Sequence, residues 1–174
     1  RNEEIDFIFS FQYDQIISQE VINCAKHGII NLHFGPLPRY RGVSTNGLAI
    51  LNGEKEFGVT LHYIDPGVDT GDIIDQAMFD ISTIENARCL YDQCVEEGIN
   101  LFQKNFKSIL ECTNARIPQD NSKALYNANG TIDFSKNVIN WKKDTNSLTN
   151  WIKAFIFDPI QFPKFTYQGE EYFV

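Results

Sequence analysis

Residues 5–33 read IDFIFSFQYDQIISQEVINCAKHGIINLH, and this stretch predicts the fold class. The runs Ile5–Phe11 and Ile29–His33 are short and apolar and resemble strands that are buried on both faces. Between them, Ser18 is placed to cap a helix that ends at Gly28. A strand, a helix and a strand within about thirty residues predict a βαβ unit, and therefore parallel strand pairing.

The chain that follows continues the α/β pattern. A short helix is predicted to carry Leu48 and to end at the Asn52–Gly53 turn. The predicted strands beyond it are Phe57–Ile64 and Ile73–Ile81, joined by a turn at Asp65–Asp72. Thr83 is placed to cap a long amphipathic helix through Cys112. The expected fold is therefore α/β with a mostly parallel sheet.

The sequence divides the chain into three segments. Residues 1–113 are expected to form the main core, and residues 114–146 form a polar, irregular connection that contains Pro118 and Gly130. In residues 147–174, Ser147 is placed to cap a short helix that Pro159 ends, and a strand is expected from Phe165 to Val174.

Composition limits the class of protein. A chain of 174 residues with 43% hydrophobic and 22% charged residues suits one folded domain and excludes collagen-like or disordered classes. Fifteen basic and 23 acidic residues give a net charge of −8, which argues against a broad phosphate-binding surface. The four cysteines show no zinc-finger spacing, and no signal peptide or membrane-length apolar run is visible. We therefore expect a cytoplasmic protein with reduced thiols.

Asn31, His33 and Asp69 are the candidate catalytic residues. Residues two apart on a strand share a face, and Asn31 and His33 end a strand at the sheet edge where α/β proteins bind ligands. A carboxylate beside the imidazole would orient it and favour its protonated form. Two alternatives stay open at this point: the Asn–His pair could tie down its own loop, and Asp69 could serve only the IDPGVDTGD turn.

Several blocks in order resemble the formyltransferases that use 10-formyltetrahydrofolate. These blocks are NLHFGPLPRYRG at 31–42, AILNGEKEFGVTLHYID at 49–65 and PGVDTGDII at 66–74. The family includes glycinamide ribonucleotide, methionyl-tRNA and sugar-nucleotide N-formyltransferases. Its hallmark is Asn-x-His followed by a loop aspartate, and here Asp69 follows His33 by 36 residues, as the family pattern requires. The implied fold is a Rossmann-like core whose amino-terminal strands, upstream of Ile5, are missing from this sequence.

The resemblance implies a role for each candidate. Asn31 would donate to the developing oxyanion, His33 would act as base, and Asp69 would orient His33. The co-substrate would be 10-formyltetrahydrofolate, and no metal is called for. The residues implied to frame the folate are Tyr13, Asp14, Ile17, Asp65 and Val68. For Tyr13 and Ile17, plain core packing is an equally good interpretation.

The resemblance also suggests the acceptor. Arg39, Tyr40 and Arg41 lie in a stretch that is similar to the tRNA and sugar branches, and the arginines could pair with an acceptor phosphate. Alternatively, Arg41 could merely hold the loop. Gly35 and the acidic charge favour a sugar over tRNA.

The leading acceptor is a dTDP-4-amino-4,6-dideoxyhexose. Its N-formylated product would enter a surface polysaccharide such as O-antigen in lipopolysaccharide, and the carboxyl-terminal residues 162–174 resemble a β-region that often supports a homodimer. No nucleic-acid or membrane partner is expected. The alternatives are a methionyl-tRNA formyltransferase, a formyltetrahydrofolate hydrolase, and an inactive folate-binding fragment.

Overall fold

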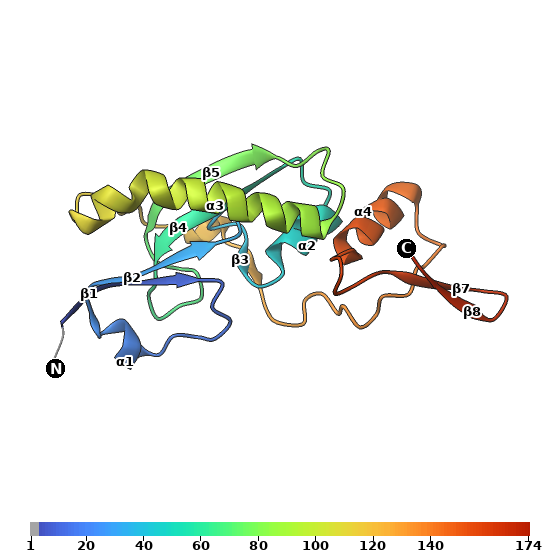
Figure 1. Ribbon diagram of the computed structural model, residues 1–174, viewed down its shortest axis with the longest axis horizontal. Helices are drawn as coiled ribbons and strands as arrows, with labels where there is room; N and C mark the ends of the chain where they lie inside the picture. The colour runs from blue at the N-terminus through green and yellow to red at the C-terminus, as the bar shows by residue number, and fades with distance from the viewer. Residues whose placement is uncertain (1–3) are drawn as a thin grey trace.

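A computed structural model describes residues 4–174, and its centre is a four-stranded sheet (Figure 1). The strand order is β1-β2-β4-β5, and these strands are β1 (Ile5–Phe11), β2 (Ala25–His33), β4 (Glu56–Tyr63) and β5 (Ile73–Asp80). The parallel pairing predicted for residues 5–33 is confirmed between β1 and β2. Strand β4 runs antiparallel to β2 and also to β5, and the second pairing follows because the short Asp65–Asp72 connection returns the chain beside β4. The α/β fold class is confirmed.

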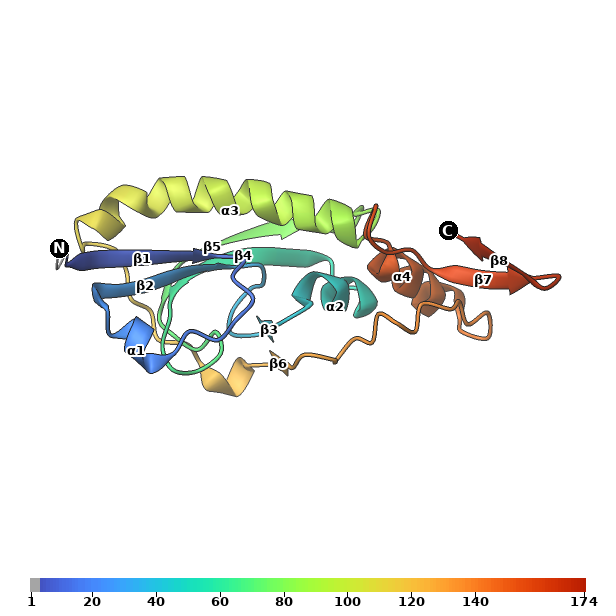
Figure 2. The ribbon, with the colours of Figure 1, turned by 60° about the horizontal axis from the view of Figure 1, so that its bottom comes forward.

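The sheet has different cover on its two faces (Figure 2). Helix α3 (Ala87–Leu110) lies along one face and buries Leu90, Cys94 and Leu101 against it. The other face carries α1 (Gln19–Ile22), α2 (Thr45–Leu51) and long loops. One face of the sheet is therefore packed core, and the loop-covered face is free to form a binding site.

The first helix is much shorter than predicted. Helix α1 has four residues, and the expected continuation to Gly28 is wrong because Ala25–Gly28 belong to β2. There Ala25 pairs with Ile5 and Gly28 pairs with Phe7, so ladder hydrogen bonds replace the helical ones. Gly28 has a φ of +113°, a conformation that a glycine adopts without strain. Ser18 occupies the N-cap position of α1 without making a side-chain capping bond.

Two other predicted helix caps are wrong by a few residues. The Asn86 side chain accepts from the Cys89 backbone N–H and starts α3, so Thr83 is not the cap. Asp144 accepts from the Ser147 backbone N–H and starts α4 (Thr145–Phe155), which places Ser147 inside the helix. Asn and Asp side chains accept such hydrogen bonds just as Ser and Thr side chains do. The sequence near each helix start therefore offered several candidates for the N-cap residue.

The rest of the chain extends the molecule beyond the sheet. Within the irregular stretch, a 3₁₀ turn at Asn121–Lys123 precedes β6 (Tyr126–Asn127), which pairs in parallel with β3 (Arg41–Gly42). The predicted single strand from Phe165 to Val174 is a hairpin instead. Its arms are β7 (Lys164–Tyr167) and β8 (Glu170–Phe173), and the turn between them has positive φ at both residues. Among the described residues, no helix is long and apolar enough to cross a membrane.

The packing of α3 gives a stability prediction. We expect Leu90→Ala to lower the free energy of unfolding by about 2–5 kcal/mol, because Leu90 is fully buried and its loss leaves a cavity. Ile99→Ala, on the same helix but half exposed, is the matched control and should change it by about 0.5 kcal/mol or less. Urea unfolding followed by circular dichroism measures both. Equal effects of the two substitutions would contradict this account of the core.

Candidate active site

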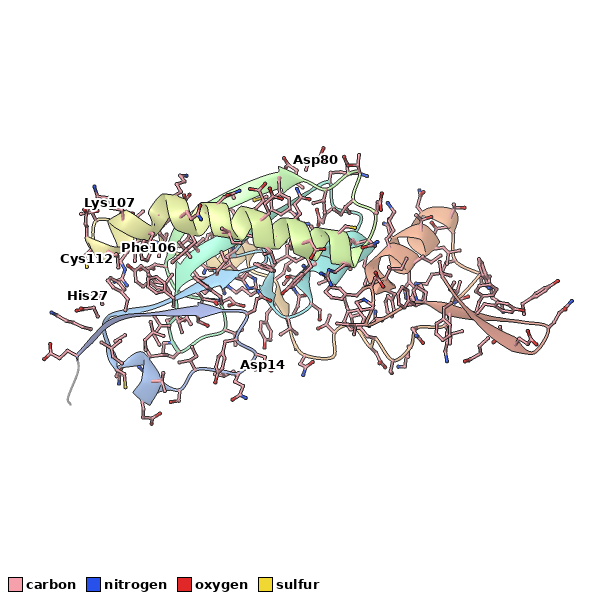
Figure 3. All side chains as sticks on the ribbon, in the orientation of Figure 1. Asp14, His27, Asp80, Phe106, Lys107 and Cys112 are labelled. Atoms are coloured by element: carbon pink, nitrogen blue, oxygen red, sulfur yellow. The ribbon has the colours of Figure 1, made fainter. Side chains whose placement is uncertain are left out.

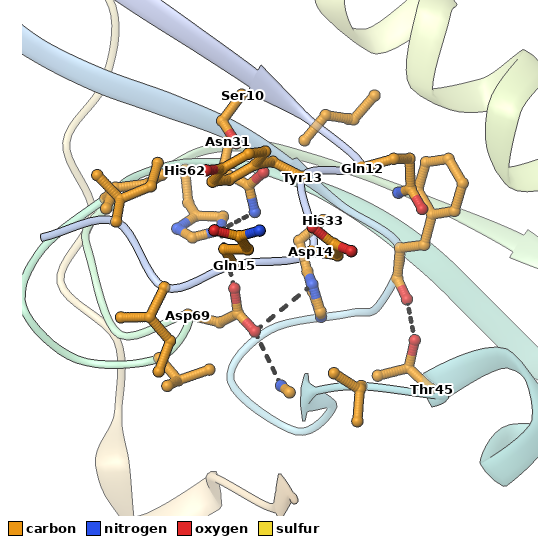
Figure 4. Close-up of a pocket in the computed structure, with 18 of the residues that line it drawn as sticks. Ser10, Gln12, Tyr13, Asp14, Gln15, Asn31, His33, Thr45, His62 and Asp69 are labelled. Carbon is orange, nitrogen blue, oxygen red and sulfur yellow. Dashed lines mark hydrogen bonds and ion pairs between the residues drawn. The ribbon is translucent and has the colours of Figure 1, made fainter. Parts of the chain in front are cut away.

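A pocket of about 390 Å³ lies at the carboxyl ends of β1 and β2 (Figure 4). This volume falls in the range of about 300–1,000 Å³ that is usual for small-molecule sites. Its walls are residues 12–17 after β1, the ends of β2 and β4, residues 42–46 at the start of α2, and residues 64–69. Asn31, His33 and Asp69 all line it, so the structure brings together the three residues that the sequence analysis singled out.

His33 is buried, and its ring nitrogens have different surroundings. Nε2 lies 2.5 Å from the Tyr40 carbonyl oxygen, which can only accept, so Nε2 carries the proton. Nδ1 then has the lone pair and lies 3.6 Å from Asp69 Oδ2. Gly35 makes room for this arrangement, since a Cβ there would come within 2.7 Å of both His33 Nε2 and the Tyr40 oxygen.

The protonation of His33 reflects two opposing effects. Burial lowers the pKa of the imidazole from 6.5, and this effect outweighs the Asp69 charge, which acts to raise it. His33 is therefore a neutral base near pH 7. Once it takes a proton at Nδ1, the Asp69 carboxylate lies beside the new positive charge.

Asp69 is fixed by backbone contacts from distant parts of the chain. Its Oδ2 accepts from the Gly42 N–H at 2.8 Å, and its carbonyl oxygen accepts from Gln119 Nε2 at 2.9 Å. Its φ of +53° is unusual for a residue with a side chain. Burial acts to raise the pKa of Asp69, but the His62 and His33 rings in their protonated forms, together with the Gly42 N–H, lower it to about 2. Asp69 is therefore an anion throughout the neutral range.

Asn31 contacts a histidine that the sequence analysis missed. Its Nδ2 lies 3.2 Å from His62 Nε2, and the same nitrogen lies 3.6 Å from Asp69 Oδ1. Figure 4 shows His62 and His33 on either side of the Asp69 carboxylate. One signal was present in the sequence: Thr60 and His62 are polar residues two apart in the buried part of β4, and they share one face.

The residues implied to frame the folate all line this pocket. They are Tyr13, Asp14, Ile17, Asp65 and Val68. Tyr13 is 59% exposed, so core packing does not explain it. Figure 3 shows Asp14 at the carboxyl-end side of β1, at the opposite end from His27. A buried donor, Asn46 Nδ2, also lies in the pocket wall and has no protein partner among residues 4–174. An acceptor atom on a bound ligand would satisfy this donor.

The three residues proposed to bind the acceptor lie outside the pocket lining. Arg39 pairs with Glu54, and the buried Tyr40 donates its hydroxyl to the same carboxylate at 2.8 Å. Arg41 is 7% exposed, and its guanidinium donates to Gln119 Oε1 at 2.7 Å and to Asn121 Oδ1 at 2.8 Å. These contacts agree with the alternative in which Arg41 holds the loop.

The fold and the site define an α/β protein with a buried base, a fixed carboxylate and an amide donor around one pocket, which is an arrangement suited to acyl transfer. The family described as formyl transferase matches residues 1–105. The chain belongs to this family.

Two groups of known proteins are similar to the chain, and the first consists of curated methionyl-tRNA formyltransferases. Methionyl-tRNA formyltransferase from Acetivibrio thermocellus is 33% identical over 166 residues, which cover 95% of this chain and 52% of that protein. The chain thus spans about half the length of the curated relatives it matches.

The second group consists of solved structures of sugar enzymes. The N-formyltransferase from Helicobacter canadensis, in complex with folinic acid and dTDP-3-aminofucose, is 38% identical with a TM-score of 0.82 and covers 92% of this chain and 58% of that one. The sugar 3N-formyl transferase WlaRD, in the presence of dTDP and 5-N-formyl-THF, is 40% identical with a TM-score of 0.77, covering 88% and 57%.

The surroundings of His33 predict how it titrates. Its imidazole should lose its proton with a midpoint below 6.5, because burial penalises the charged ring. Asp69→Asn should lower the midpoint further, since it removes the negative charge that favours the imidazolium. Proton–carbon NMR of the ring Cε1–H across pH measures both values, with His33→Ala assigning the signal. A midpoint above 6.5, or an upward shift in Asp69→Asn, would contradict this electrostatic account.

Proposed function

We propose that this chain forms the catalytic part of an enzyme that transfers a formyl group from 10-formyltetrahydrofolate to the amine of a nucleotide-linked amino sugar. The observation that carries the proposal is the convergence of Asn31, His33 and Asp69 on one pocket, with 3.6 Å between His33 Nδ1 and Asp69 Oδ2. Family membership supports formyl transfer, and the sugar enzymes among the similar structures support the acceptor class.

Each side chain has a distinct task in this reaction. The acceptor amine adds to the formyl carbon, and the carbonyl electrons move to the oxygen, where an Asn31 N–H donates. The amine proton passes to the lone pair of His33 Nδ1, and Asp69 stabilises the imidazolium. The bond from the formyl carbon to folate N10 then breaks, and the proton held at His33 is available to the leaving nitrogen.

The similar structures refine the choice of sugar. The two at 38% and 40% identity are described with dTDP-3-aminofucose and as a sugar 3N-formyl transferase, whereas a 4-N formyltransferase from Francisella tularensis is 27% identical. We therefore place a dTDP-linked 3-amino-dideoxyhexose ahead of the 4-amino sugar favoured by the sequence. The acidic charge supports a small acceptor over tRNA.

The second candidate is methionyl-tRNA formyltransferase. It is favoured by one observation, the 31–34% identity to curated proteins of that name over most of this chain. The same Asn31, His33 and Asp69 would serve it, because the acceptor is again a primary amine. Only the acceptor distinguishes the two proposals.

Turnover assays test the function. Incubation with 10-formyltetrahydrofolate and dTDP-3-amino or dTDP-4-amino dideoxyhexoses should give a product heavier by one formyl group, detected by mass spectrometry.

His33→Ala and Asn31→Ala should each lower kcat by about 10²–10⁴ with the fold retained, since one removes the base and the other an oxyanion donor. Turnover with charged initiator tRNA alone would reassign the acceptor. Formate release without any acceptor would indicate hydrolysis, and folate binding without turnover would indicate an inactive protein.

A further inference from the structure

His62 has two ring nitrogens with defined partners. It is 1% exposed and lies on β4 in the pocket wall. Nδ1 lies 2.8 Å from the carbonyl oxygen of Tyr63, and because a carbonyl only accepts, Nδ1 carries the proton. In the neutral ring, Nε2 is left with a lone pair and can only accept a hydrogen bond.

The partner of that lone pair is Asn31. In the antiparallel pairing of β2 with β4, Asn31 and His62 are directly opposite each other, so their separation is set by the ladder. The 3.2 Å contact joins His62 Nε2 to Asn31 Nδ2, which donates. Because His62 Nε2 can only accept, the NH₂ group of the Asn31 amide faces it, and one of the two N–H groups is used in this hydrogen bond. The other N–H has no protein partner among residues 4–174, and the side chain lines the pocket.

His33 has the opposite tautomer. There Nε2 donates to Tyr40 and Nδ1 has the lone pair, while in His62 Nδ1 donates to Tyr63 and Nε2 has the lone pair. Both lone-pair nitrogens lie 3.6 Å from an Asp69 oxygen. Among residues 4–174, only the His62 lone pair also has a donor within hydrogen-bond distance, and that donor is the Asn31 amide. The two rings therefore differ in what they can do: His33 is free to take a proton, and His62 is engaged in holding Asn31.

We propose that His62 is a positioning residue, which as its Nδ1–H tautomer holds the Asn31 carboxamide so that the free N–H faces the formyl oxygen. The inference rests on the proposed function, because it assigns a task to Asn31 in formyl transfer. His62 acts through Asn31 and contacts no reacting atom. Its loss should therefore lower kcat more than it changes KM, since misplacing a donor weakens transition-state stabilisation.

Two substitutions distinguish the roles of the two ring nitrogens of His62. The amide of Gln reaches roughly the place of Nε2, so His62→Gln still offers Asn31 an acceptor. The shorter Asn reaches only the place of Nδ1, so His62→Asn keeps a partner for Tyr63 and leaves Asn31 unheld. We expect His62→Asn to lower kcat about 10- to 100-fold with KM changed less than about threefold, and His62→Gln to recover most of that loss. His27→Gln, at the far end of β2 and 37% exposed, is the control and should leave turnover unchanged.

A double-mutant cycle tests the route through Asn31. In an Asn31→Ala background, His62→Asn should have almost no further effect on kcat, because the group that it positions is already gone. The proposal is overturned if the two losses multiply, or if His62→Gln is as slow as His62→Asn. Thermal unfolding of each variant shows whether a loss of activity reflects a loss of folded protein.

One measurement needs no activity and no substitution. Nitrogen-15 NMR of the histidine rings at neutral pH distinguishes a protonated nitrogen from one with a lone pair. We expect protonated Nδ1 in His62 and protonated Nε2 in His33. Protonated Nε2 in His62 would overturn the proposal even in an active enzyme. If the protein transfers no formyl group to any acceptor, the proposed function is rejected. The NMR spectrum still determines the tautomer of His62 in that case.

Discussion

One buried carboxylate between two imidazoles is the constraint on which the site depends. Removing a charge from water is costly unless other groups replace its hydration, and the Gly42 N–H donates a hydrogen bond to the Asp69 carboxylate. The two imidazoles enclose the carboxylate at 3.6 Å and compensate its charge when they are protonated, and Gln119 binds the Asp69 carbonyl oxygen. These partners come from four stretches of the chain, so the anion cannot be kept buried unless all four are packed together.

The same constraint sets the acid–base properties of the pocket. A pKa near 2 keeps Asp69 charged, while burial keeps His33 neutral despite the adjacent anion. A neutral base beside a permanent anion is ready to accept a proton, and it is stabilised as soon as it does so. A stronger interaction between His33 and Asp69 would leave the imidazole protonated before the reaction begins. Without Asp69, the imidazolium that forms during the reaction would have no counter-charge.

The sequence predicted the parts of the molecule that depend on local pattern. Alternation placed Asn31 and His33 on one face of β2, and the apolar runs located the four sheet strands. The approach of Asp69 is a long-range contact, and only the family spacing predicted it. His62 was missed because the two polar residues Thr60 and His62 in a buried strand give no indication of their partners until the pairing register of His62 with Asn31 is known. The caps of α3 and α4 were misplaced since several neighbouring polar residues could serve equally well.

The loop at residues 38–42 can now be understood through the catalytic groups that it holds. The Tyr40 carbonyl fixes the tautomer of His33, the Gly42 N–H binds Asp69, and Arg41 binds the Gln119 side chain that in turn binds the Asp69 backbone. Arg41 uses its donors inside the protein and is buried, whereas the Arg39 side chain is 56% exposed and keeps donors free. Of the two arginines, Arg39 is therefore the one whose guanidinium is accessible to solvent, and it pairs with Glu54 outside the pocket lining. Arg41 holds Asp69 in place through Gln119, which is a structural contribution to the site.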